Sequence, residues 1–238
     1  MTLFEQLETA VDSVISQQWN KRTAVVVPST SDVALAGGAV ELDATFLYAD
    51  LAASSKMVKE LDRRVAAKVL KSFHSTVCML IKSLDGSVVS FDGDRVLGVF
   101  VGKSKNTEAA KCGLQIKYAV RKIIRPKFEA KYESVRNASF KISHGVGIDT
   151  GAVLAVRAGV RGDNDLIWIG RAPNLAAKLS DLRESPHETF ITAAVYNMLN
   201  ETSKLGGKDN KQSMWESRSW TFLDEKMTVY RSSWTWKP

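Results

Sequence analysis

Apolar residues recur at helical spacing near the start of the chain, with polar residues between them. The repeat runs from Leu3 to Trp19 through Leu7, Val11 and Ile15. This spacing predicts an amphipathic helix. The apolar face of such a helix packs on its own domain or contacts a second subunit, and the sequence leaves both open. The following residues, 23–38, predict a connecting segment.

The middle of the chain changes from strand spacing to helix spacing and back. A first core strand is predicted over 42–50, a helix over 65–80, a hairpin from strands 87–91 and 95–101, a helix capped by Asn106, and an alternating strand over 140–148. The order strand-helix-strand-strand-helix-strand is the split βαβ pattern. We therefore expect an α+β fold, an α/β sandwich of the ferredoxin-like βαββαβ type.

The last third predicts further strands at 153–160 and 166–169, a helix at 171–182 and two closing strands at 217–223 and 227–236. The polar residues 201–212 predict a loop. We divide the chain into an N-terminal helix and connecting segment, residues 1–40, and one domain with a C-terminal extension, residues 41–238.

The 238-residue chain carries a formal charge of +7 and has a pI near 9.4, which favours anionic partners. Its basic residues are scattered among acids without interleaved aromatic residues, so we expect no nucleic-acid binding. No apolar run reaches the roughly 18 residues of a membrane span, and the start lacks signal-peptide features. We expect a cytoplasmic protein, no membrane contact and reduced thiols at Cys78 and Cys112.

Two carboxylates follow apolar strands closely. Asp50 ends the strand in FLYADLAASS, and Asp94 lies in FDGDRVLGVF, where Asp92-Gly93 predicts a hairpin turn. Paired carboxylates at neighbouring strand ends are suited to Mg²⁺ or Mn²⁺ beneath a nucleoside triphosphate. The alternative is that both aspartates hydrogen-bond turn amides.

Four ordered blocks resemble the class III nucleotidyl cyclases over residues 42–200. They are Ala49-Asp50, Gly93-Asp94, Gly147–Gly151 and the run from Ile169 to Lys178. The resemblance implies the palm-like sheet of the cyclase catalytic domain. It also implies an obligatory homodimer, with each active site shared between two subunits.

For metal and phosphate binding, the resemblance implies that Asp50, Asp94 and the backbone carbonyl of Leu51 hold two Mn²⁺ or Mg²⁺ ions. The amides of residues 53–55, which are Ala53, Ser54 and Ser55, start a predicted helix and would contact phosphate oxygens. Asn174 matches the family's ribose-orienting asparagine. Lys178 stands where the family usually has an arginine that stabilises the transition state, and Arg171 could supply the guanidinium.

The positions that read a purine base depart from the family. Ser90 and Ile167 stand where adenylate cyclases carry a lysine and an aspartate or threonine. Tyr48 shares a strand face with Asp50 and would shorten the base pocket. Arg95 could donate hydrogen bonds to a pyrimidine carbonyl. We expect Phe46, Tyr48, Arg95 and Ile167 to bind the base.

These features resemble the pyrimidine cyclases of bacterial Pycsar antiphage systems. The resemblance implies a uridylate cyclase that converts UTP to cyclic UMP and pyrophosphate, and a separate effector protein that the product activates. A cytidylate cyclase, a purine cyclase and a catalytically silent nucleotide-binding module remain alternatives. A palm-like nucleic-acid-binding domain is supported by charge alone.

Overall fold

The computed structural model describes residues 1–238 and contains one large mixed sheet. Its strand order is β10-β11-β7-β5-β2-β4-β3, with β1 paired to β2 and β6 paired to β5. The strands are β1 (Asn20–Thr23), β2 (Gly38–Ala52), β3 (Ser87–Asp92), β4 (Arg95–Phe100), β5 (Ser143–Val160), β6 (Asp163–Ile169), β7 (Thr189–Thr192), β10 (Glu216–Phe222) and β11 (Glu225–Ser232). A separate small pair joins β8 (Leu205–Gly206) to β9 (Gln212–Ser213).

The helices are α1 (Leu3–Ile15), α2 (Ser54–Glu60), α3 (Arg63–Ser83), α4 (Lys105–Ala119), α5 (Arg125–Lys131), α6 (Glu133–Arg136), α7 (Arg171–Ser180), α8 (Ala193–Asn197) and α9 (Glu201–Lys204). A 3-10 turn, η1 (Thr30–Asp32), precedes β2, and a π-helical segment, η2 (Val120–Ile124), joins α4 to α5. None of these helices combines the length and apolar character needed to cross a membrane.

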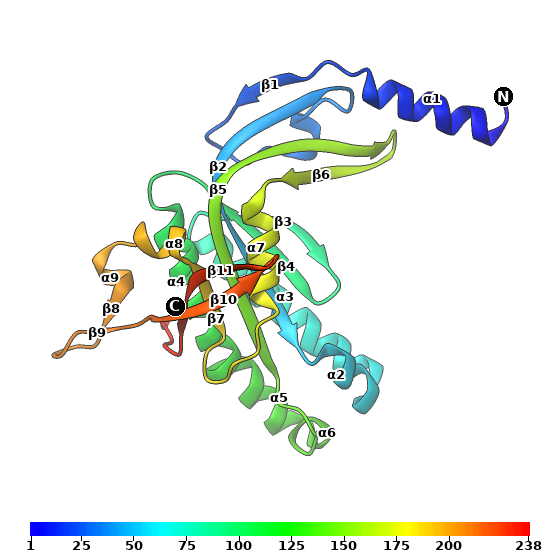
Figure 1. The fold of residues 1–238 in the computed structure, drawn as a ribbon. Helices are drawn as coiled ribbons and strands as arrows, with labels where there is room; N and C mark the ends of the chain where they lie inside the picture. Colours follow the sequence, from blue (N-terminus) through cyan, green and yellow to red (C-terminus); the bar gives the residue numbers. More distant parts are fainter.

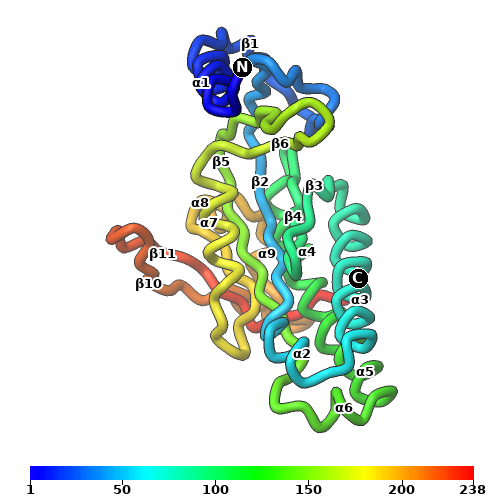
Figure 2. The backbone as a smooth tube through the Cα atoms, turned by 90° about the vertical axis from the view of Figure 1, so that its right-hand side faces the viewer, coloured from blue at the N-terminus to red at the C-terminus, as the bar shows by residue number.

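Helices cover the two faces of the sheet unequally. Figure 2 shows α7 on one side of β2 and β5, and α3 on the other. The main core lies on the α3 and α4 side, where Leu47, Ala49 and Leu51 of β2 pack with Phe73 and Val77 of α3. A smaller core lies under α7. The sequence prediction of an α+β sandwich with the order β2-α3-β3-β4-α4-β5 is therefore confirmed.

The strands β2 and β5 run beyond this core and form an arm (Figure 1). They pair antiparallel along almost their whole length, from Ala52 opposite Ser143 to Ala39 opposite Val156. The sequence predicted two separate strands in place of β5, and a shorter β2. The glycines and threonine within 147–151 stay in the strand because each of them is paired in register with a residue of β2.

The predicted N-terminal helix is present as α1, which projects from the arm in Figure 1. A capping box between Thr2 and Glu5 starts it. None of its residues is buried, and Leu7 and Val11 are each 57% exposed. The expectation that the apolar face of α1 packs against another surface therefore stays a prediction.

Three local predictions were wrong. The hairpin turn consists of Gly93-Asp94, because Asp92 and Arg95 pair as the last ladder residues, and Gly93 takes the required positive φ of 58°. Asn106 does not cap α4, which Ser104 precedes. It is buried within the helix and accepts a hydrogen bond from Thr45 at 3.0 Å. The predicted loop at 201–212 contains α9, β8 and part of β9.

Candidate active site

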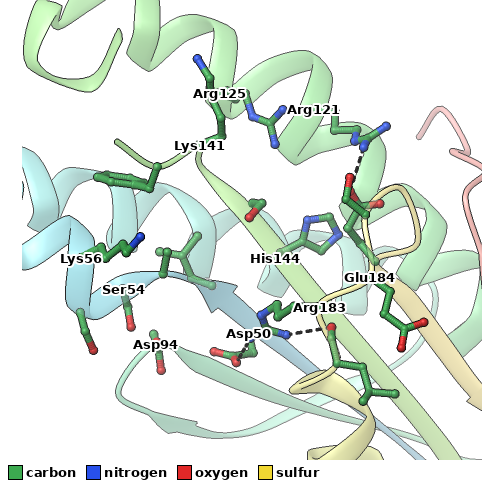
Figure 3. Close-up of a pocket in the computed structure, with 18 of the residues that line it drawn as sticks. Asp50, Ser54, Lys56, Asp94, Arg121, Arg125, Lys141, His144, Arg183 and Glu184 are labelled. Carbon is green, nitrogen blue, oxygen red and sulfur yellow. Dashed lines mark hydrogen bonds and ion pairs between the residues drawn. The ribbon is translucent and has the colours of Figure 1, made fainter. Parts of the chain in front are cut away.

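The two predicted carboxylates lie together in one cavity of about 670 Å³ (Figure 3). The amide of Leu51 donates a hydrogen bond to the carbonyl of Asp94 at 3.2 Å, which ties the end of β2 to the β3–β4 turn. Asp50 is 4% exposed, and its Oδ1 has no hydrogen-bond partner. Burial raises the pKa of Asp50 above its usual range, Arg183 opposes this rise, and the charge of Asp94 adds to it.

Two arginines approach Asp50 from different elements. Arg183, in the loop after α7, ion-pairs with Asp50 Oδ2 at 2.5 Å. Arg95, at the start of β4, lies 3.8 Å from the same oxygen and 2.5 Å from Asp181. Sequence reasoning missed Arg183, since it is 133 residues from Asp50 and no motif marks it.

Helix α7 presents three of the predicted residues outward. Arg171, Asn174 and Lys178 are exposed, and none of them lines the cavity around Asp50. The opposite side of α7 lies directly on β5, where a Cβ added at Gly147 would come within 2.1 Å of the Ala176 carbonyl oxygen. This close packing fixes the direction of the outward side chains.

Each of the three outward side chains has a different local environment. Arg171 lies 3.4 Å from the buried carboxylate of Asp149. The amide of Asn174 donates only to the Gly170 carbonyl of its own helix, at 3.2 Å. No ion pair involves Lys178. Asn174 and Lys178 are thus available to a molecule that approaches α7 from outside.

The predicted base-binding residues do not form one group in a single chain. Tyr48 is half-buried on the α7 side of the sheet, and burial raises the pKa of its phenol. Phe46 is fully buried, with its ring centroid 5.4 Å from that of Trp168. Ile167, on β6, lines a different cavity, between the arm and the end of α1. Phe46 is therefore a core residue that does not line the cavity around Asp50, and Ile167 lines a different cavity from Asp50.

The predicted phosphate-contacting residues lie beside the carboxylates. Leu51, Ala53, Ser54 and Ser55 all line the cavity. Ala53 has φ 59° and ψ 28°, an αL conformation that is uncommon for a residue with a Cβ. The chain turns sharply there, so that α2 begins next to the carboxylates. Lys56 follows on the same wall of the cavity.

A set of cations on the α4 side of the same cavity was not predicted. It comprises Arg121, Arg125 and Lys141, next to the buried His144 (Figure 3). The sequence predicted only a helix that begins at Asn106 and a strand over 140–148, and it gave no role to these cations or to His144. A spacing of four residues between Lys117, Arg121 and Arg125 was the available signal.

The carboxylate end of the cavity fits divalent cations. Asp50 Oδ1 is buried and unpartnered, and Asp94 is close enough for its charge to raise the pKa of Asp50. The chain gathers no group of three or more acidic, histidine or cysteine side chains that could hold a metal. Two carboxylates and one backbone carbonyl would therefore leave most coordination positions to phosphate oxygens and water, which is usual for Mg²⁺ at nucleotide sites.

The fold defines a class. The adenylyl cyclase CyaB from P. aeruginosa superposes with a TM-score of 0.67 at 17% identity, over 82% of this chain and 95% of that one. At this identity the likeness concerns the fold alone, which is that of the class III cyclase catalytic domain. No family model matches the chain.

Sequence relatives define the family more narrowly. The uridylate cyclase of Rhodovulum sp. (strain MB263) is 53% identical over 238 residues, which is 100% of this chain and 99% of the relative. The uridylate cyclase of Burkholderia cepacia is 40% identical over 99% of both chains. The chain belongs to the uridylate cyclase family and is a nucleotidyl cyclase.

Proposed function

We propose that this cyclase converts UTP to 3′,5′-cyclic UMP and pyrophosphate. The observation that carries the proposal is the full-length, 53% identity to a protein named uridylate cyclase. Tyr48 beside Asp50 supports it, because a half-buried phenol on this strand face leaves less depth for a purine. Cytidylate cyclase is the second candidate, since UTP and CTP have the same size.

The carboxylate end of the cavity would hold two Mn²⁺ or Mg²⁺ ions through Asp50, Asp94 and the carbonyl of Leu51. When bound, such ions lower the pKa of a hydroxyl group and stabilise charge on a leaving phosphate. Asp50 and Asp94 fix where the triphosphate lies relative to the sheet. Ala53, Ser54 and Ser55 form the adjoining wall, where phosphate oxygens would approach.

We also propose that the active form is a homodimer in which α7 of one subunit completes the site of the other. The outward direction of Asn174 and Lys178 supports this, because neither lines the cavity of its own chain. In this arrangement Asn174 orients the ribose. Lys178 places a positive charge at the reacting phosphate, and Arg171 adds a second one after leaving Asp149.

Base selection would rest on Arg95 and Tyr48. Arg95 has several N–H donors and lies 3.8 Å from Asp50, which lines the cavity. A pyrimidine carbonyl could take one of these donors while Asp181 holds another. Because burial raises the pKa of Tyr48, its phenol stays protonated and can donate a hydrogen bond. Phe46 supports Tyr48 from within the same strand.

On the resemblance to Pycsar cyclases, we also propose a role for the product in the cell. Cyclic UMP would act as a second messenger in antiphage defence and activate a separate effector protein in the cytoplasm. Infection of cells that carry the cyclase with and without Asp50→Ala tests this. Equal phage resistance in both strains would contradict the defensive role.

The substrate is identified by a direct experiment. Purified protein is incubated separately with ATP, GTP, CTP and UTP, each with Mn²⁺ or Mg²⁺, and the cyclic product is identified by mass. We expect cyclic UMP as the main product. Preferential turnover of CTP or of a purine triphosphate would contradict the proposed substrate, and turnover without any divalent cation would contradict the metal assignment.

The shared site is tested by complementation. Asp50→Ala and Asn174→Ala proteins should each be inactive, whereas a mixture should regain part of the activity, because each heterodimer has one intact composite site. Exchange of subunits is checked with two differently tagged chains. Exchange without any recovery would place the whole site within one chain.

A further inference from the structure

Three cations form a row along the continuous helical segment α4-η2-α5. Lys117, Arg121 and Arg125 are spaced four residues apart, so they project from neighbouring positions on one side. Like charges at this spacing destabilise a helix. The π-helical segment η2 carries the middle residue, and π-helical turns are frequent at functional sites. Negatively charged groups must therefore lie close to the row to offset the repulsion between its cations.

The chain supplies too little of that charge. Glu188 ion-pairs with both Lys117, at 2.6 Å, and Arg121, at 2.9 Å. Arg125 uses its Nε to donate to the carbonyl of Ile142 at 2.6 Å, and no carboxylate lies within ion-pair distance of it.

A fourth cation adds to the same wall. Lys141 has only Glu129 as a partner, at 3.5 Å. The four cations Lys117, Arg121, Arg125 and Lys141 thus meet two carboxylates, Glu188 and Glu129, and two positive charges remain in excess. This excess faces the cavity through Arg121, Arg125 and Lys141.

His144 provides an independent sign of a missing ligand. The side chain is 2% exposed and lines the same cavity, yet neither Nδ1 nor Nε2 has a hydrogen-bond partner. A buried polar group in this state is costly. Burial and the surrounding cations, Lys117, Arg183, Arg121 and Arg125, lower the pKa of His144 to about 3. The ring is therefore neutral and offers one N–H donor.

This part of the cavity is distinct from the carboxylate end. His144 lies directly opposite Leu51 in the β2–β5 ladder, so its side chain shares the α3 and α4 side of the sheet with Leu51. Asp50, one residue earlier, points to the other side. Figure 3 shows His144, Arg121 and Arg125 across the strand from Asp50. We call Arg121, Arg125, Lys141 and His144 the helix-side chamber.

We propose that the helix-side chamber binds a phosphate-type dianion or polyanion, and that its ligand is the pyrophosphate released by cyclisation. This rests on the proposed function only in that the reaction releases pyrophosphate. The ribose 3′ oxygen forms a bond to the α-phosphorus, the bond from that phosphorus to the β-phosphate oxygen breaks, and pyrophosphate leaves with the electron pair. The 3′-hydroxyl proton passes to solvent. Pyrophosphate held behind β5 is removed from the reacting atoms, so the reverse reaction is suppressed.

Binding of inorganic pyrophosphate, measured by calorimetry without metal or nucleotide, tests the proposal. We expect Arg125→Ala to weaken binding at least tenfold and Arg125→Lys to weaken it less. Lys127→Ala is the matched control, because Lys127 is exposed on the same helix and does not line the cavity. Circular dichroism checks that each variant is folded. Equal affinities in Arg125→Ala and Lys127→Ala would overturn the proposal.

Two further measurements separate this proposal from the proposed function. Asp50→Ala should keep its pyrophosphate affinity, because Asp50 lies across the strand. Loss of binding in that variant would show that pyrophosphate binds at the carboxylates. It would overturn the proposal that pyrophosphate binds in the helix-side chamber. Inorganic phosphate should bind more weakly than pyrophosphate, and the reverse order would overturn pyrophosphate as the ligand. A substrate other than UTP would contradict the proposed function and leave all these expectations unchanged.

Discussion

The two faces of strand β2 have opposite characters over the same few residues. On the α3 and α4 side, Leu47, Ala49 and Leu51 are buried in the main core. On the α7 side, Tyr48 is half-buried and Asp50 has a buried oxygen without a partner. Over these residues of β2, one face is filled by apolar side chains of the chain itself, whereas the other has unused hydrogen-bonding capacity. Stability and function are thereby divided between the two faces of a single strand, and substitutions on each should affect different measurements.

The largest effect is expected at the functional face. Asp94→Ala should reduce cyclisation at least about a thousandfold, because a bound Lewis acid contributes several kcal/mol to transition-state stabilisation and about 4 kcal/mol corresponds to that factor. Turnover at saturating metal and UTP measures it. Asp92→Ala is the matched control, since Asp92 is exposed two residues earlier in the same hairpin. Similar activities in the two variants would remove Asp94 from the metal site.

The core face should respond in stability instead. Phe73→Ala in α3 should lower the free energy of unfolding by about 3–5 kcal/mol, because Phe73 is fully buried and its removal leaves a cavity. Denaturant unfolding measures the loss. Met79→Ala, on the same helix at a position 72% exposed, should change stability little. Activity per folded molecule should stay close to wild type in both variants. A large loss of turnover in folded Phe73→Ala protein would contradict the division between the faces.

The base-binding residues test the functional face at a finer level. Arg95→Ala should cost the pyrimidine substrate about 1–3 kcal/mol, the usual penalty when a polar group loses its partner in a closed site. Tyr48→Ala should improve the relative use of purine triphosphates by enlarging the pocket. Ratios of kcat/KM for UTP and ATP measure both changes. If neither variant shifts the ratio, these residues do not select the base.

The sequence predicted the core face better than the functional face for a physical reason. Burial follows local periodicity, so the spacing of apolar residues alone predicted the strand through Asp50 and a helix over 65–80, which spans 63–83 in the structure. Asp50 and Asp94 could be found as well, because each lies in a short motif. Arg183 and His144 could not, because their roles depend on a loop and a ladder partner far away in the sequence.

Errors in the prediction have the same origin. Asn106 has the residue type of a helix cap, but it lies inside α4 because a buried hydrogen bond from Thr45 satisfies it there. The residues 147–151 suggest a break, yet β5 continues through them because β2 provides a continuous partner. Long-range pairing decided both cases.

The smallest expected effect concerns His144, which lies where the apolar face of the sheet ends. Because the pKa of His144 is lowered to about 3 in the folded protein, the unfolded chain binds a proton first as the pH falls below 6.5. The contribution of the neutral ring to the free energy of unfolding is therefore fully present above pH 6.5 and is lost progressively toward pH 3.

Between pH 7 and pH 5.5 the free energy of unfolding should fall by roughly 1 kcal/mol through His144. Denaturant unfolding of wild type and His144→Gln at both pH values, in a phosphate-free buffer, isolates the contribution of His144, because all other residues are the same in both proteins. An equal pH dependence in the two proteins would show that His144 is not held neutral by burial and by the cations of the helix-side chamber.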